Sequence, residues 1–218
     1  MAIKDSDFAM FKFYREKFPE GDTLAILGDC SFHMAGGEKA FKKGLGFTTV
    51  DTFDINGNPT YKVDLNEPLD EKLFSKYDWI IDSGTLYCCF NVPMVLKNML
   101  SLLKDSGCCV HTSNLVGFFG RGYYSLSPAL FKEFYEANQF VIEGLGTKTK
   151  RGPGWVSLAS KGTYLYEATS DYLNFSTKAS PYIESIPNDV LLYCVARRTK
   201  RVDYAQPIPE HFTRTHGK

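Results

Sequence analysis

The sequence predicts a single α/β domain built on a mostly parallel sheet with helices on both faces. The chain has 218 residues, enough to bury a core of its own and short enough for one domain. Strand and helix patterns alternate through the first two thirds with short links, which is typical of parallel strands joined by helical crossovers. Hydrophobic residues make up 44% and charged residues 23% of the chain, an ordinary globular composition.

The elements follow from periodicity and from turn residues. Phe8, Phe11, Tyr14 and Phe18 recur at helical spacing and predict an amphipathic helix. Apolar and β-rich runs that end at glycine, asparagine or aspartate predict strands. These strands are expected at 23–27, 47–55, 61–65, 77–81, 108–112, 141–145 and 190–196, with a weak helix at 38–43.

Two further helices are predicted from residues that typically begin or end a helix. Apolar residues on one face predict a helix over 92–103, which Asn91 can cap, Pro93 can open and Gly107 ends. A second helix is predicted to begin at Ser127-Pro128, where a capping hydroxyl precedes a proline with helical φ.

The domain is expected to span residues 1–202, with 146–189 as an insertion and 203–218 as a loosely ordered tail. The insertion is too long for a plain connection. Its aromatic residues predict either a lid over the site or a small satellite core: Tyr164, Tyr166, Tyr172, Phe175 and Tyr182.

Charge and composition exclude several functions. Lys plus Arg is 25 and Asp plus Glu is 25, so the chain lacks the basic balance of a general nucleic-acid binder or of a protein that binds anionic membranes. The basic run at 197–201 is interpreted as a solvated face, with nucleic-acid contact as the alternative. We find no signal peptide or membrane span in the sequence and expect a cytoplasmic protein.

The six cysteines are interpreted as reduced and mostly buried thiols. Two adjacent pairs occur, but no Cys-x-x-Cys spacing. Vicinal cysteines point in different directions on a strand, so we expect no metal site.

Acidic residues lie at or just after the ends of four of the first five predicted strands. In an open parallel sheet, ligands bind beyond the carboxyl ends of the strands. One such aspartate is more often a turn former or a helix cap, but four together favour a ligand site. The strand exits carry, in order, Gly28 and Asp29, then Asp54, then Asp64, then Asp82, Ser83 and Gly84, and finally His111.

The chemistry of these exits favours an adenosyl ligand without phosphates. Asp54 can accept two hydrogen bonds from a ribose diol, and Asp64 can accept one from the exocyclic amine of adenine. Gly28 allows close approach of the backbone, but the residues after it lack the three spaced glycines of a pyrophosphate loop.

At these positions the sequence resembles the class I S-adenosylmethionine-dependent methyltransferases, and more closely a bacterial branch of them. The branch has DLNEPL, D-GTLEH-FN and GHGFY-FSP-LF blocks. This chain has DLNEPL at 64–69, DSGTLYCCFN at 82–91 and GRGYYSLSP at 120–128. LLKDSG before the fifth strand corresponds to LLKPGG in the family, and the resemblance covers residues 23–145.

The resemblance implies a Rossmann-like seven-stranded sheet whose last strand is antiparallel. It implies S-adenosylmethionine as cofactor and methyl transfer to a small molecule, for example a sugar or another polar metabolite. Its implied cofactor contacts are Gly28 with Asp29 in the first loop, Asp54 at the ribose, Asp64 and Leu65 at adenine, and Asp82, Ser83 and Gly84 beside methionine.

The chain departs from the branch at two positions. Tyr87 stands where the branch tends to have Glu, and Arg121 replaces a histidine. We expect Tyr87, Arg121, Tyr123 and Tyr124 to contact the acceptor, with Tyr87 also a catalytic candidate. His111 is the first candidate for a general base because its ordinary pKa suits neutral pH, and a structural histidine is the alternative.

Two other functions stay open. A protein that keeps this fold without catalysis would account for the irregular first loop and for Tyr87. A nicotinamide-dependent oxidoreductase on a similar sheet is disfavoured by the same loop. No pattern in the sequence indicates the acceptor or the oligomeric state.

Overall fold

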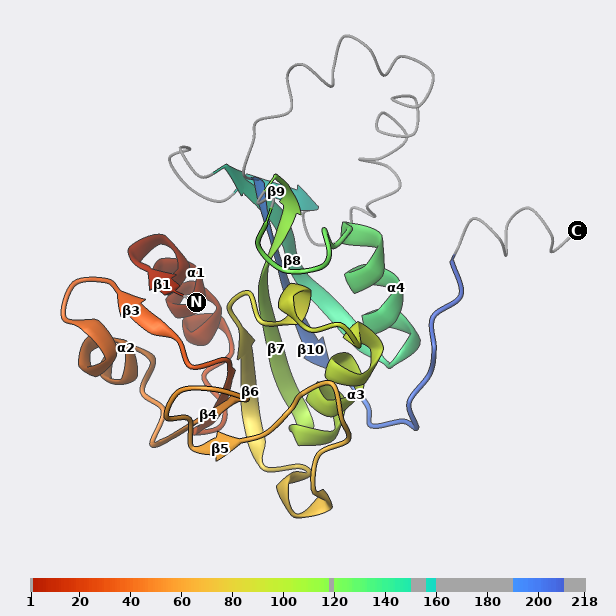
Figure 1. Cartoon of the computed structure of the whole chain (residues 1–218), viewed down its shortest axis with the longest axis horizontal. Helices are drawn as coiled ribbons and strands as arrows, with labels where there is room; N and C mark the ends of the chain where they lie inside the picture. Colours follow the sequence, from red (N-terminus) through yellow and green to blue (C-terminus); the bar gives the residue numbers. More distant parts are fainter. Residues whose placement is uncertain (1, 118–119, 150–155, 160–189, 210–218) are drawn as a thin grey trace, which may run out of the picture.

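An eight-stranded sheet runs through the centre of the protein in a computed structural model that describes residues 2–117, 120–149, 156–159 and 190–209 (Figure 1). Its strand order is β5-β4-β2-β6-β7-β10-β8-β9. The strands are β2 (Thr23–Leu27), β4 (Thr49–Asp54), β5 (Tyr61–Lys62), β6 (Tyr77–Asp82), β7 (Leu103–Val116), β8 (Phe140–Thr149), β9 (Val156–Ala159) and β10 (Val190–Arg198).

The strand directions confirm the predicted fold class. The strands from β5 to β7 are parallel to one another. Strand β10, the last among the described residues, lies between β7 and β8 and is antiparallel to both. The seven predicted strands are therefore present, although β7 is much longer than the predicted 108–112. The eighth, β9, lies in the segment interpreted as an insertion and was not predicted; it pairs with the edge of β8.

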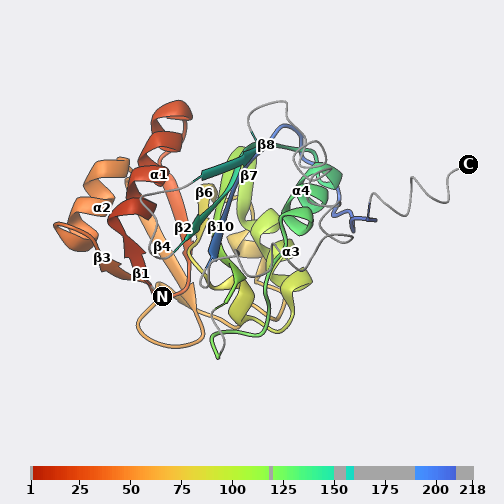
Figure 2. The same ribbon diagram turned by 90° about the horizontal axis from the view of Figure 1, so that it is seen from above.

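Helices cover both faces of the sheet, as Figure 2 shows. Along β2, Leu24 and Ile26 pack in one cluster and Ala25 and Leu27 in the other, because successive strand residues point to opposite faces. Helices α1 (Asp5–Lys17) and α2 (Gly37–Leu45) cover the first face. Helices α3 (Val92–Leu102) and α4 (Pro128–Ala137) cover the second.

The starts of α3 and α4 agree with the capping residues in the sequence. The Asn91 side chain accepts a hydrogen bond from the amide of Met94 (3.3 Å). The Ser127 hydroxyl accepts one from the amide of Leu130 (3.3 Å). Both contacts satisfy amides that have no partner inside the helix.

A second, two-stranded sheet explains why the loop after β2 is not rich in glycine. Strand β1 (Ala2–Lys4) pairs in parallel with β3 (Ser31–His33), and neither strand was predicted. The Asp5 carboxylate also accepts a hydrogen bond from the amide of Ala35 (3.2 Å). The first loop is thus held by the N-terminal strand and not by a tight glycine turn.

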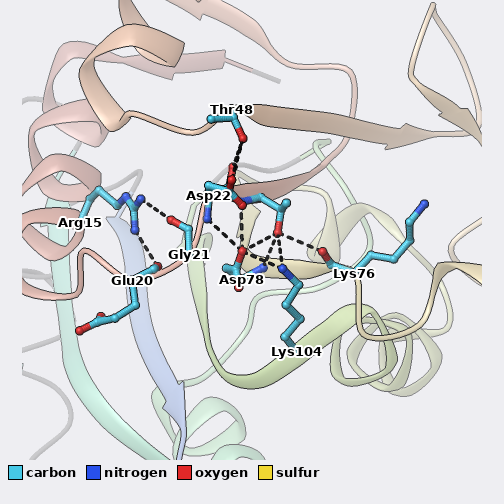
Figure 3. Close-up of polar contacts among 9 residues, drawn as sticks. Arg15, Glu20, Gly21, Asp22, Thr48, Lys76, Asp78 and Lys104 are labelled. Atoms are coloured by element: carbon cyan, nitrogen blue, oxygen red, sulfur yellow. Dashed lines mark hydrogen bonds and ion pairs between the residues drawn. The ribbon is translucent and has the colours of Figure 1, made fainter.

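A polar cluster lies at the end of the sheet where the central strands β2 and β6 begin (Figure 3). The Asp78 carboxylate accepts hydrogen bonds from the amide of Asp22 (3.0 Å), from the hydroxyl of Thr23 (2.6 Å) and from Lys104 (3.0 Å). Gly21 has φ of 78°, and a side chain there would collide with Asp78. These contacts join the turn before β2 to β6 and β7.

The described part of the predicted tail contacts α4. The Asn138 side chain donates to the carbonyl of Ala205 and accepts from its amide, both at 2.9 Å. The Tyr204 ring lies against Phe134. Within the described ranges, no helix has the length and apolar character needed to cross a membrane.

Candidate functional site

The exits of β2 and β4 meet around one carboxylate. Gly28 follows β2 with φ of 92°, in the left-handed region that favours glycine. Asp54 ends β4 and is half-buried. One of its carboxylate oxygens accepts from the amide of Asp29 (2.7 Å) and the other from the amide of Asn56 (3.0 Å). Asp54 is therefore fixed in orientation beside the first loop.

Asp29 is an exposed residue of the first loop. Its carboxylate accepts a hydrogen bond from the amide of Asn58 (3.1 Å), and a side chain at Gly57 would collide with it. Asp29 thereby packs against the turn that follows β4. This contact brings its amide to Asp54.

Asp64 and Leu65 follow β5. One Asp64 carboxylate oxygen accepts from the amide (2.9 Å) and side chain (2.7 Å) of Asn66. Leu65 is buried, and its carbonyl accepts from the Asn98 side chain (3.0 Å). Among the described residues the Leu65 amide has no hydrogen-bond acceptor. That amide and the second oxygen of Asp64 remain for a ligand.

Two asparagines that the sequence analysis did not select hold this segment in place. Asn66 accepts from the amide of Asn91 (2.9 Å), which caps α3. Asn98, on the buried face of α3, contacts the backbone of Leu65, Glu67 and Leu69. Asn66 could have been selected from the sequence because it lies inside the DLNEPL block. Asn98 could have been selected as a polar residue in an otherwise apolar helix.

Asp82 ends β6 and is fully buried. One of its oxygens accepts from the amides of Thr85 (2.7 Å) and Leu86 (3.1 Å). The other lies 2.9 Å from Nδ1 of His111. Both oxygens are thus occupied inside the protein, and Asp82 has no surface through which to touch a ligand directly.

Ser83 and Gly84 form the turn between β6 and the 3-10 helix η2 (Leu86–Cys88). Gly84 has φ of 95°. The Ser83 hydroxyl accepts from Thr112, inside β7 (3.3 Å). The Thr85 hydroxyl donates to the carbonyl of Leu27 (2.6 Å), so this turn is tied to the end of β2 and to β7.

His111 is fully buried, which places it where a structural histidine would lie and not where a base could reach an acceptor. Nδ1 lies against Asp82, and Nε2 lies 2.5 Å from the hydroxyl of Tyr135 on α4. The Phe131 ring packs against the imidazole, with centroids 4.7 Å apart. Neither ring nitrogen is free in this arrangement.

Tyr87, on η2, is half-buried, and its backbone binds the loop at 120–124. Its carbonyl accepts from the amides of Tyr123 (2.8 Å) and Tyr124 (3.3 Å). Burial raises the pKa of the Tyr87 hydroxyl, Cys88 and Asp82 raise it further, and Arg121 opposes them. The phenol therefore keeps its proton at neutral pH and can donate a hydrogen bond.

Exposed aromatic rings gather beside Tyr87. Phe90 and Tyr123 are 71% and 69% exposed, and their ring centroids lie 5.6 Å apart. Tyr124 donates its hydroxyl to the carbonyl of Phe90 (2.9 Å). Arg121 is exposed on the same loop. Phe90 was missed because it lies in a loop without a periodic pattern.

Four of the six cysteines lie in the core, whereas Cys88 is exposed and Cys89 is half-buried. All six are unpaired, and Cys30, Cys108, Cys109 and Cys194 are buried. Burial raises the pKa of Cys30 and of Cys109 to about 12. Searching only the described residues for three or more His, Cys, Asp or Glu that could hold a metal ion finds no such group.

No family model and no curated protein matches the sequence. Solved structures do match it. A Bacillus halodurans protein assigned to the methyltransferases is 12% identical, with a TM-score of 0.56 over 89% of this chain and 100% of that chain. The fold is that of the class I S-adenosylmethionine-dependent methyltransferases.

Two neighbours with this methyltransferase fold were solved with S-adenosylhomocysteine. The 1,6-didemethyltoxoflavin-N1-methyltransferase of Burkholderia thailandensis is 13% identical, with a TM-score of 0.52 over 90% of this chain and 80% of that one. NodS, an N-methyltransferase of Bradyrhizobium japonicum, is 11% identical, with a TM-score of 0.51 over 90% and 89%.

Within this methyltransferase fold, the predicted residues divide into two groups. One group lines the strand exits with atoms that remain available: Gly28, Asp54, Asp64, the amide of Leu65, and the Ser83–Gly84 turn. The other group has its partners within the protein: Asp82 and His111 are fully buried, and one oxygen of the exposed Asp29 accepts from the turn after β4. The predicted lid aromatics at 164–182 lie outside the described residues.

Proposed function

We propose that this protein binds S-adenosylmethionine at the strand exits and transfers its methyl group to a small-molecule acceptor. The arrangement of Asp54 carries the proposal. Its carboxylate is held by two backbone amides beside Gly28, and each oxygen retains a lone pair for a ribose hydroxyl. A fixed carboxylate in this position binds a diol and repels a phosphate.

Atoms that remain available after β5 suit an adenine ring. The second oxygen of Asp64 accepts from the exocyclic amine, and the Leu65 amide donates to a ring nitrogen. The glycine positions at 28 and 84 allow the cofactor to approach the backbone. The neighbours solved with S-adenosylhomocysteine support the same ligand class.

The acceptor is proposed to bind against Tyr87, Arg121, Tyr123 and Tyr124, the motif positions that meet at one loop. The cofactor supplies an activated methyl group on a sulfonium. The protein holds the acceptor in line with it and excludes water. Because the Tyr87 phenol keeps its proton and His111 is buried, orientation and not proton removal is the main contribution of these residues.

Thermal unfolding with S-adenosylmethionine, S-adenosylhomocysteine and NAD tests the cofactor. A ligand at about 100 times its Kd adds about 2.7 kcal/mol of stability, which raises the Tm of a domain of this size by about 5–10 °C. We expect this shift with both adenosyl ligands and none with NAD. A shift with NAD alone would favour the oxidoreductase.

A pair of variants tests the ribose contact. Asp54→Ala is expected to raise the Kd for S-adenosylhomocysteine about tenfold or more, because it removes hydrogen bonds to a charged group. Asp70→Ala is the matched control, since Asp70 caps the 3-10 helix η1 (Glu71–Leu73) and pairs with Lys72, before β6 begins. An equal Kd for Asp54→Ala and the wild type, by titration calorimetry, would reject the ribose assignment.

A further inference from the structure

A chain of three buried polar side chains links α4 through β7 to the end of β6. Tyr135, His111 and Asp82 are each fully buried and lie in contact in that order. We propose that His111 and Tyr135 are positioning residues for the cofactor: they orient the Asp82 carboxylate, which sets the shape of the turn at 83–86. This inference rests on the proposed function, because it concerns the same ligand site.

Asp82 shapes the turn through two successive amides. Its first oxygen accepts from the amides of both Thr85 and Leu86, and only one orientation of the carboxylate plane allows both hydrogen bonds. The second oxygen lies against His111, and this contact fixes that orientation. Asp82 therefore acts on the ligand only through the backbone of the turn.

The turn itself contacts the two strands next to β6. Thr85 donates to the carbonyl of Leu27, the last residue of β2. Ser83 accepts from Thr112, inside β7. A shift of this turn would move the backbone on both sides of the proposed methionine position.

Stability alone does not require this arrangement. Buried ionic groups can often be replaced by apolar ones without loss of stability, and α4 already packs through Phe131 and Phe134. Tyr135 is suited to hold the imidazole as a neutral phenol. Its burial, with Cys109 and Cys194 nearby, holds its pKa well above the ordinary value.

The test uses variants that separate the two contacts of His111. In His111→Asn the amide nitrogen lies close to the place of Nδ1 and can still donate to Asp82. In His111→Gln it lies closer to the place of Nε2, near Tyr135. We expect His111→Asn, which loses only the contact with Tyr135, to raise the Kd for S-adenosylhomocysteine about threefold. We expect His111→Gln, which loses the contact with Asp82, to raise it about tenfold, as expected for losing a hydrogen bond to a charged group.

Tyr135→Phe removes only a hydroxyl and is expected to raise the same Kd about threefold, as in His111→Asn, because both variants lose the contact between the two side chains. Tyr77→Phe is the matched control. Tyr77 is equally buried and donates to Asp51 (2.8 Å), but it lies at the start of β6 and away from the strand exits. It should lower the Tm without changing the Kd.

Amide NMR shifts of Thr85 and Leu86 give a readout that needs no ligand. Amides that donate to a carboxylate resonate at low field, and we expect this feature in the wild type and in His111→Asn but not in His111→Gln. Equal Kd values for the wild type, His111→Gln and Tyr135→Phe, or equal weakening in the Asn and Gln variants, would overturn the inference. A wild-type protein that binds no adenosyl ligand would instead reject the proposed function, and the NMR comparison would still decide whether His111 positions the turn.

Discussion

At the scale of single residues, position along a strand predicted which side chains gather, but not which of them face a ligand. Asp54 and Asp82 both end parallel strands and look alike in the sequence. Asp54 is half-buried with two backbone partners, whereas Asp82 is fully buried with three partners. The difference comes from His111 and α4, which are distant in sequence, so no local pattern contains it.

Asp78 offers a test of how one carboxylate stabilises the fold. Burial raises its pKa, but hydrogen bonds from Thr23, Lys104 and the amides of Asp22 and Thr23 outweigh this and lower it. Since the pKa is lower in the folded than in the unfolded chain, the stabilisation is present above about pH 4 and is lost as the pH falls through the folded value.

We therefore expect Asp78→Asn to lower the free energy of unfolding by about 1–3 kcal/mol at pH 7. Its stability should also depend less on pH below about 4 than that of the wild type. Urea unfolding at several pH values measures both effects. Asp105→Asn, an exposed carboxylate at 3.7 Å from Arg201, is the control and should change little. Parallel acid curves for the Asp78→Asn variant and the wild type would contradict the assignment.

At the scale of elements, most helices and strands were predictable because their signals are local. Asn91 and Ser127 cap the helices as their spacing predicted. The pairing of β1 with β3 was not predictable, because three-residue strands have no periodic pattern and depend on contacts distant in sequence. The interpretation of the basic run as a solvated face was wrong for Arg198, which is 3% exposed.

Arg198 caps α3 from another element. Its guanidinium donates to the carbonyls of Leu100 (2.7 Å) and Leu103 (2.8 Å), where the helix ends. We expect Arg198→Met to lower the free energy of unfolding by about 2–4 kcal/mol, because these carbonyls lose charged donors in a buried site. Arg201→Met, on an exposed side chain of the same run, should change it by less than about 0.5 kcal/mol. Equal midpoints in urea unfolding for the two variants would show that the cap contributes nothing.

At the scale of the whole molecule, the predicted fold class is confirmed because alternation and short links restrict the topology strongly. The eighth strand, β9, extends this fold at the edge that carries the insertion. The two core clusters meet across the central strands, with Ile80 in one and Ile81 in the other. Strand β5, at one edge of the sheet, lacks this double coverage, since Tyr61 is half-buried and Lys62 is exposed.

Hydrogen exchange should follow this division. The amides of β6, covered on both faces, should exchange only on global unfolding, and those of β5 should exchange much faster through local opening. Mass spectrometry of exchanged peptides covering 61–62 and 77–82 measures the contrast. Equal protection of the two strands would mean that the sheet opens as one unit.

The position of β10 has a consequence for synthesis on the ribosome. This strand is the last in the described part of the chain, but it lies between β7 and β8. Until residues 190–198 emerge from the exit tunnel, both of those strands present an unpaired edge, and exposed edges invite pairing with other chains. Arg198 lies in the same strand, so the carbonyls at the end of α3 also lack their capping donor until β10 has been synthesised. The nascent chain therefore gains its complete sheet in one late step, and ribosome-bound chains that stop before residue 190 should need a chaperone to stay unaggregated.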